Sequence, residues 1–152
     1  MRMKEAMMMK GARTLLDICV AVKPGESVFI VTDMIQEGIG QVLAAAALER
    51  GAEVTVAIMT PRERAGQEPP KLIAEGMKHA DIVLLPVSFS VTHTYAVKEA
   101  AACGARLLVL TDFTEEMLIR GGIEADFREL KPLCQSVAEA FAKGNQVHLT
   151  SP

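Results

Sequence analysis

The sequence contains few aromatic side chains and no tryptophan. Its 152 residues include five Phe and one Tyr, too few for a surface that stacks on nucleic-acid bases. The formal net charge is −3, and the charged residues are scattered along the chain. The chain therefore offers no basic patch for phosphate groups or for an anionic membrane surface. We expect no nucleic acid and no membrane among its partners.

Cysteine and long apolar runs are scarce too. Cys19, Cys103 and Cys134 lie far apart, and none belongs to a Cys-x-x-Cys motif. We expect reduced, buried thiols that behave as small apolar side chains. Charged residues interrupt the Met-rich start at residues 1–10, so no secretory signal is predicted. No apolar run approaches the ~18 residues of a membrane span, which predicts a soluble, cytoplasmic protein.

What the sequence does contain is a regular alternation of helical and extended patterns. Its length and ordinary composition predict a single α/β domain over residues 1–152. Single helices between strands require parallel pairing through right-handed crossovers. We predict a Rossmann-like α/β fold, a doubly wound, mostly parallel sheet of four to five strands with helices on both faces. The predicted strands are 27–32, 53–59, 81–87 and 105–110, with a strand-like tail at 146–150; the predicted helices are 8–22, 38–50, 69–79, 95–103 and 126–143, with a short one after Thr114.

The first predicted helix has one apolar stripe. Apolar residues recur in it at spacings of three and four, which is typical of an amphipathic helix with one buried face. The stripe consists of Met8, Ala12, Leu15, Cys19 and Val22.

A glycine pair opens the second predicted helix. Gly38 and Gly40 follow the first strand after a gap of several residues, and Leu43 stands where a dinucleotide fingerprint has its third glycine. The second strand also lacks the acidic residue that would bind a ribose. We therefore expect glycines that ease the start of a helix, and no NAD site.

A polar loop at residues 88–94 is the main candidate for a binding site. It follows the third strand, and ligands of open α/β sheets bind at the carboxyl ends of the strands. His93 is the candidate substrate donor or proton shuttle, since imidazole titrates near neutral pH. The alternative is that a threonine only caps the next helix and His93 faces solvent. The hydroxyl groups expected to contact substrate belong to Ser88, Ser90, Thr92 and Thr94.

Two aspartates follow predicted strands and widen this candidate site. Asp33 and Asp112 each come directly after a strand and a threonine. Both are expected to contact substrate, and with His93 they would be chemically adequate ligands for iron or zinc. The alternative is that both are ordinary turn residues. His79 and His148 stand in unrelated contexts and complete no metal-binding motif.

Several segments in one order along the chain carry a family resemblance. They include KPGES at 23–27 and THT at 92–94; the others are 11–13, 30–33, 50–54, 68–70, 80–81 and 114–118. Together they resemble the N-terminal half of the aminopeptidase T and leucyl aminopeptidase-like family, which also contains the 2,5-dihydroxypyridine dioxygenases. The resemblance covers nearly the whole chain.

The resemblance implies an enzyme with a second half that holds the catalytic metal. A divalent metal (Zn, Co or Fe) would activate water against a peptide bond in the peptidase branch. In the dioxygenase branch, ferrous iron would bind a hydroxypyridine and oxygen, and the ring would open. The N-terminal half would help to form the substrate cavity and the oligomer. No residue of this chain matches the family's metal ligands, so we expect no metal bound by this chain alone.

The leading expectation is a substrate-cavity and assembly domain of a leucyl aminopeptidase-like metal-dependent hydrolase, inactive on its own. Its partners would be a missing C-terminal half or separate subunit and further copies of itself in a homo-oligomer. One alternative is the same domain of a non-haem iron hydroxypyridine dioxygenase. Another is a stand-alone module that binds a small carboxylate or only oligomerises, with the methionines at 7–9 as an apolar contact.

Overall fold

A computed structural model describes residues 3–151 and contains one parallel sheet. Over these residues the sheet has four strands in the order β2-β1-β3-β4, all paired in parallel. The predicted α/β fold is confirmed. The strands are β1 (Ser27–Asp33), β2 (Glu53–Met59), β3 (Ile82–Val87) and β4 (Arg106–Thr111).

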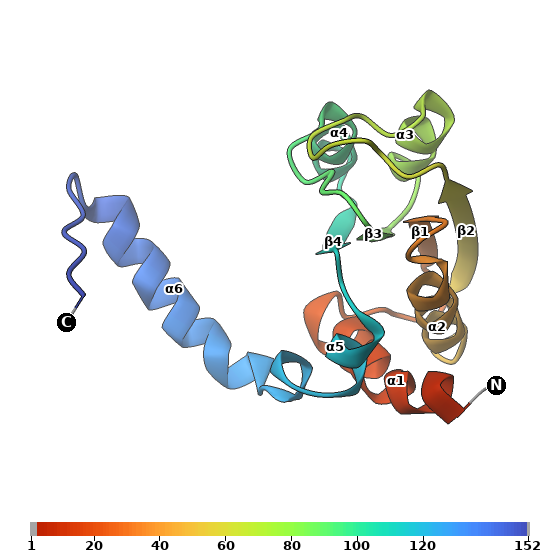
Figure 1. Cartoon of the computed structure of the whole chain (residues 1–152), viewed down its shortest axis with the longest axis horizontal. Helices are drawn as coiled ribbons and strands as arrows, with labels where there is room; N and C mark the ends of the chain where they lie inside the picture. Colours follow the sequence, from red (N-terminus) through yellow and green to blue (C-terminus); the bar gives the residue numbers. More distant parts are fainter. Residues whose placement is uncertain (1–2, 152) are drawn as a thin grey trace.

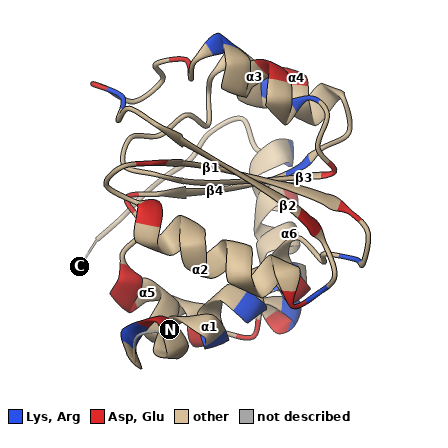
Figure 2. Ribbon diagram, turned by 90° about the vertical axis from the view of Figure 1, so that its right-hand side faces the viewer, with Lys and Arg blue, Asp and Glu red and all other residues tan. Residues whose placement is uncertain are grey.

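Helices cover both faces of this sheet (Figure 2). On one face lie α1 and its continuation η1, a π-helix, together with α2 and α5; α3 and α4 lie on the other. The longest helix, α6, extends away from the body (Figure 1). No helix within residues 3–151 combines the length and apolar character that crossing a bilayer requires. The bounds are α1 Met3–Thr14, η1 Leu15–Cys19, α2 Glu37–Leu48, α3 Lys71–Met77, α4 Tyr95–Ala102, α5 Glu115–Ile119, the 3₁₀-helix η2 Gly122–Glu124 and α6 Phe127–Lys143.

Each face of the sheet has its own apolar core, because alternate strand residues point to opposite sides. Beneath α1, α2 and α5 the core includes Met8, Leu16, Ile30, Leu43, Leu84 and Leu118. Beneath α3 and α4 it includes Val31, Met77, Val83, Leu85 and Ala100.

The first helix differs from its predicted stripe. Met8, Ala12 and Leu15 are buried as expected, but Cys19 is exposed. The reason is the π-helical turn at η1, which places an extra residue in the turn and rotates the following side chains. Leu16 is buried instead. All three cysteines are exposed, so the prediction of buried thiols is wrong.

The predicted strand at 146–150 is also wrong. These residues form neither helix nor strand, although their sequence alternates as a strand would. A strand is stabilised by a hydrogen-bonded neighbour, and this segment follows α6, which has already carried the chain away from the sheet (Figure 1).

The amino ends of the central strands are joined by an aspartate and a serine. The Asp81 carboxylate accepts hydrogen bonds from the Ser27 backbone N–H at 2.8 Å and from its hydroxyl at 2.7 Å. These contacts hold the pKa of Asp81 below its ordinary value. Nearby, the Arg106 guanidinium contacts Glu26 at 2.6 Å and donates to the carbonyl of Val20 at 2.7 Å. The start of β4 thereby anchors the loop that leads into β1.

A close backbone contact joins α1 to α5. A Cβ added to Gly11 would lie 2.1 Å from the carbonyl oxygen of Leu118, far closer than any real carbon-oxygen contact. Thr114 begins α5 by accepting a hydrogen bond from the Met117 N–H at 3.3 Å, which confirms it as the N-cap. The absence of a side chain at Gly11 lets α5 pack directly on α1.

Gly11→Ala should therefore destabilise the fold by about 3 kcal/mol, because the clash is with backbone and no side chain can move aside. Gly38→Ala is the matched control, since its Cβ would meet only the flexible Glu115 carboxylate at 3.4 Å; we expect a change within about 0.5 kcal/mol. Urea unfolding midpoints measure both. Equal midpoints for the two variants would contradict the assigned α1–α5 contact.

Stability should also fall in mild acid, because hydrogen bonds lower the pKa of two carboxyls. Arg106 first, and then the Lys23 N–H, lower the pKa of Glu26, while the Ser27 donors lower that of Asp81. Such groups stabilise the fold above their ordinary pKa of about 4 and lose this contribution as pH falls through the lowered folded value. Arg106→Met should flatten the dependence of the unfolding midpoint between pH 5.5 and 3.

The control for the acid experiment is Arg120→Met, which removes an exposed ion pair with Glu116. That variant should keep the wild-type pH profile, since exposed pairs contribute little. If Arg106→Met kept the wild-type profile as well, Glu26 would not be a source of the acid sensitivity.

Candidate functional site

The strand order creates a switch point between β1 and β3. From β1 the chain passes through α2 to β2 on one side, and from β2 it crosses back through α3 to β3 on the other. Open α/β sheets bind ligands at such a point, at the carboxyl ends of the strands. Here the β1–β3 pairing ends at Ile30 and Leu84, two residues before Pro86, which has no N–H to donate.

Beyond the last paired residues, Asp33 spans the gap between the two strand ends. Its Oδ2 accepts hydrogen bonds from the Ser88 N–H at 2.7 Å and the Ser88 hydroxyl at 2.6 Å. Its Oδ1 accepts from the N–H groups of Ile35 and Gln36 at 3.0 and 3.1 Å. The side chain is 1% exposed. The structure thus places Asp33 as an anchor that fixes Ser88 and the start of the loop that follows it.

The loop at 88–94 is ordered by its own hydroxyl groups. The hydroxyls of Ser90 and Thr92 lie 2.9 Å apart. The buried Thr94 hydroxyl donates to the Val91 carbonyl at 2.7 Å and accepts from the Val97 N–H at 3.4 Å, so Thr94 caps α4. The capping alternative raised by the sequence is confirmed for this threonine.

His93 is exposed at the tip of this loop. It lines an open hollow of about 440 Å³ whose other walls are Thr92, Thr94, Tyr95 and Lys98. An imidazole, an ammonium group, a phenol and the Thr92 hydroxyl therefore border one surface beside the carboxyl edge of the sheet, whereas the Thr94 hydroxyl is buried and already bonded. Such a set can donate hydrogen bonds to a polar substrate and exchange a proton with it.

A carboxylate from another loop occupies the start of α4. Glu68 accepts hydrogen bonds from the N–H groups of Tyr95 at 2.7 Å and Ala96 at 3.2 Å. The same loop donates a second contact, from the Gly66 N–H to the Ser90 carbonyl at 2.8 Å. The positive end of α4 is thus neutralised within the chain before any ligand arrives.

Asp112 stands apart from this hollow. It is exposed, it has a φ of 48°, and its N–H donates to the Val87 carbonyl at 2.9 Å, which ties the end of β4 to the end of β3. Asp33, Ser88 and Asp112 thus share the carboxyl edge, as the sequence predicted. Across residues 3–151, however, no three His, Cys, Asp or Glu side chains are grouped to hold a metal. His93, Asp33 and Asp112, considered together from the sequence, therefore do not form such a group.

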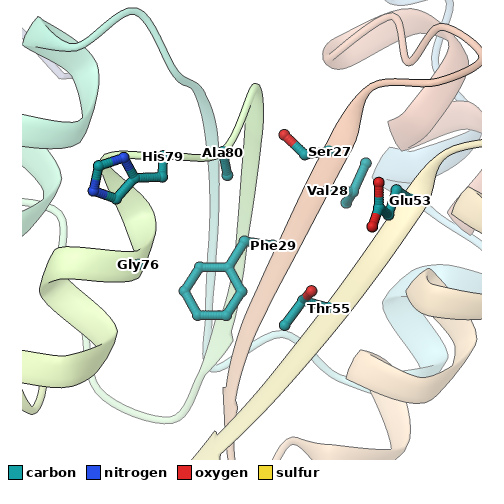
Figure 3. A pocket seen from close by; sticks show the side chains of 8 residues that line it. All are labelled: Ser27, Val28, Phe29, Glu53, Thr55, Gly76, His79 and Ala80. Atoms are coloured by element: carbon teal, nitrogen blue, oxygen red, sulfur yellow. The ribbon is translucent and has the colours of Figure 1, made fainter.

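A second hollow, of about 410 Å³, lies at the opposite edge of the sheet, between α3 and the starts of β1 and β2. Figure 3 shows the Phe29 ring at its centre, with His79 on one side and Glu53 on the other. A Cβ on Gly76 would lie 3.1 Å from this ring, so α3 packs closely over it. The polar groups do not converge on one point, and the Ser27 hydroxyl is already bonded to Asp81.

Comparison with solved structures shows a likeness in fold. The chain is similar in structure to 2,5-dihydroxypyridine dioxygenase from Pseudomonas putida KT2440, with a TM-score of 0.58 and 13% sequence identity. The match covers 70% of this chain and 34% of the dioxygenase chain, so this chain aligns with about a third of that enzyme. No family model and no curated protein sequence matches it. At this identity the likeness establishes the fold.

Sequence reasoning missed three residues of this region. Glu68 belongs to the segment 68–70 noted for the family resemblance, but no local pattern assigned it a contact, because its partners on α4 lie 27 and 28 residues further along the chain. Tyr95 and Lys98 carry the right chemistry and directly follow the polar loop. One helical turn separates Lys98 from Thr94, and this spacing could have placed both residues at the same end of the helix as His93.

Asp33→Asn should destabilise the fold by about 2 kcal/mol, because an amide nitrogen would face N–H or O–H donors where an acceptor is needed. Asp112→Asn is the control; its side chain is exposed and asparagine tolerates a positive φ, so we expect a change within about 0.5 kcal/mol. Urea unfolding of both variants measures the difference. Indistinguishable midpoints would show that the Asp33 carboxylate is no anchor.

Proposed function

We propose that this chain is the substrate-side domain of a metal-dependent enzyme of the dioxygenase kind, with the metal held outside residues 3–151. The observation that carries the proposal is the His93 hollow at the carboxyl edge of the sheet, in a fold shared with part of a 2,5-dihydroxypyridine dioxygenase. A missing C-terminal half or a separate subunit would supply the metal site. This chain would supply the substrate contacts and contribute to a homo-oligomer.

In the proposed enzyme, His93 hydrogen-bonds to a hydroxyl or ring nitrogen of the substrate and exchanges a proton with it. Thr92 and Lys98 orient the polar edge of the ring, and Tyr95, whose side chain is 75% exposed, offers a flat surface for stacking. Asp33 acts indirectly, because it fixes Ser88 at the root of the loop. The domain alone would be inactive.

The fold and the segments noted in the sequence leave a second candidate, a leucyl aminopeptidase-like hydrolase built on the same plan. In that case the hollow would hold the side chain or amino group of a peptide near a zinc or cobalt ion of the other half. The two candidates differ in the ligand that the hollow prefers, a hydroxypyridine ring or an α-amino amide.

A stand-alone module for small carboxylates is the least favoured reading. The N–H groups of α4 that would receive such a ligand already bind Glu68. A free carboxylate would have to displace an internal one and would then lie beside it, with like charges opposed.

Titration of the ¹⁵N-labelled chain with 2,5-dihydroxypyridine, leucinamide and acetate tests the proposal by NMR. We expect the dihydroxypyridine to shift the amide signals of residues 92–98. His93→Ala should weaken this binding roughly tenfold through loss of a hydrogen bond, whereas His79→Ala, in the other hollow, should leave it unchanged. Selective shifts with leucinamide would favour the hydrolase, and selective shifts with acetate would favour the carboxylate module.

Turnover provides the stronger test once the metal-bearing half is identified and added. There, His93→Ala should lower kcat/KM by roughly a hundredfold through loss of proton transfer, with an unchanged melting temperature. Wild-type kinetics for this variant would refute the assigned role of His93.

A further inference from the structure

Strand β2 forms one edge of the sheet and has an open side. Its only strand neighbour within residues 3–151 is β1, and Figure 1 shows it at the rim of the sheet. Four of its seven residues are exposed, whereas β4, at the other edge, exposes only its last residue. Val56 and Ile58 are 41% and 49% exposed. The open side of β2 is therefore the more accessible of the two strand edges.

The hydrogen bonds to β1 show which backbone groups face this open side. The Glu53 N–H donates to the Glu26 carbonyl at 2.9 Å, so Glu53 directs its backbone groups toward β1. The backbone groups of successive strand residues point to alternate sides, and the pairing with β1 is unbroken over the whole of β2. We call the residues whose N–H and carbonyl groups point away from β1 the β2 edge: Val54, Val56 and Ile58.

The row of free groups is short and symmetric about Val56. Before it, the Ala52 N–H donates to the Ala47 carbonyl on α2 at 3.3 Å. After it, the Thr60 carbonyl accepts from the Arg62 guanidinium at 2.8 Å. The chain itself thus uses one outward group at each end of the row, and the β2 edge between them is left without a partner strand.

Strand β2 also lacks the features that usually keep an edge strand from pairing. Exposed edges are commonly protected by lysine, by proline or by a bulge. The sequence of β2, EVTVAIM, contains neither residue, and its continuous pairing with β1 includes no bulge. Its one charged residue, Glu53, stands at the first position. An unprotected row of donors and acceptors that carries β-branched side chains is suited to a further strand.

We propose that the β2 edge pairs with the β2 edge of a second copy, antiparallel and centred on Val56, so that two sheets become one. Two-fold symmetry between identical copies requires the antiparallel direction. In this register Val56 faces the partner's Val56, and Val54 faces the partner's Ile58. Each facing pair exchanges two hydrogen bonds, so every free group of the β2 edge is used.

The groups at the ends of the row agree with this register. The Ala52 N–H would face the partner's Thr60 carbonyl, and both are already bonded within their own chains. A shift by two residues would place a free group of the β2 edge opposite one of these used groups. A shift by one would place it opposite a residue whose backbone groups face β1. The register centred on Val56 therefore satisfies the most hydrogen bonds.

The side chains fit the same register, because facing residues project from the same face of the sheet. On the face that packs beneath α2, Val54, Val56 and Ile58 would form β-branched cross-strand pairs. On the other face, Thr55 would meet the partner's Ala57, and both side chains are small. The interface is short, so we expect a reversible dimer with a dissociation constant of roughly 1–100 μM. The inference rests on β2 and is independent of the His93 hollow.

Sedimentation equilibrium of the 152-residue chain from roughly 1 to 300 μM measures this constant. Val56→Lys should weaken the dimer at least about tenfold, because it places two ammonium groups opposite each other at the two-fold axis. Met117→Lys is the matched control and should change nothing, since Met117 is 48% exposed on α5, which follows the strand at the opposite edge. Urea unfolding verifies that both variants fold. A monomeric wild type, or a Val56→Lys dimer of wild-type strength, would overturn the proposal.

Mixtures of charged variants test the register. Val56→Lys and Val56→Glu should each dimerise weakly, and their equimolar mixture should recover most of the lost affinity, because position 56 faces itself. The control is an equimolar mixture of Ile58→Lys and Ile58→Glu. Position 58 faces position 54, so its two charges would lie about 14 Å apart and mixing should restore little. No gain at position 56, or an equal gain at position 58, would contradict the register.

Amide hydrogen exchange tests the backbone pairing itself. In ¹⁵N-labelled protein at about 500 μM, the Val54 and Ile58 amides of the wild type should exchange at least about fivefold more slowly than those of Val56→Lys. The Thr55 and Ala57 amides face β1 and should exchange equally in both proteins. Equal exchange at positions 54 and 58 as well would show that the two copies do not pair through β2.

Discussion

The pairing of β1 with β3 is the constraint on which the rest of the structure depends. These central strands pair directly over only three residues each, and an aspartate and a serine join them at either end. Asp81 binds Ser27 at the amino ends, and Asp33 binds Ser88 at the carboxyl ends. Because the crossover from β2 to β3 must pass β1, this contact decides where α3 lies and where the switch point opens.

The two Asp–Ser contacts differ in their exposure to solvent and in the residues around them. The pair at the amino ends is exposed and continues into the network of Arg106 and Glu26, which orders the loop before β1. In the pair at the carboxyl ends Asp33 is buried and Ser88 is half-buried, and together they fill the gap that the diverging strands leave. Hydrogen bonds to an exposed carboxylate thus join the strands at their amino ends. Hydrogen bonds to a buried carboxylate join them at their carboxyl ends, where the candidate site lies.

The sequence predicted the strands well for a physical reason. β2 was predicted with its observed bounds, and the other three within one residue at each end, because runs of β-branched and aliphatic residues bounded by turns leave little choice. The same local logic identified Thr114 as an N-cap. It failed at Cys19, where a π-helical turn rotated the buried stripe, and at 146–150, where no neighbouring strand is present.

The candidate site was predictable only in part. Residues 88–94 and Asp33 could be assigned to the carboxyl edge, because parallel strands bring their ends together. The turn alternative holds for one Asp33 oxygen, which accepts from the nearby Ile35 and Gln36 N–H groups. The contact of the other oxygen with Ser88 depends on strand order, which the sequence left open. The contact of Glu68 with α4 joins loops from different crossovers, and no local pattern encodes such a contact.

Glu68 competes with any anionic ligand for the N–H groups at the start of α4. A carboxylate held on a short loop is present there at an effective concentration of roughly millimolar or more, whatever the composition of the solution. Small anions at lower concentrations are thereby screened out, while a neutral ring that binds beside the helix meets no such competition. In the proposed enzyme, Glu68 would therefore favour an uncharged ring over a small anion at the start of α4.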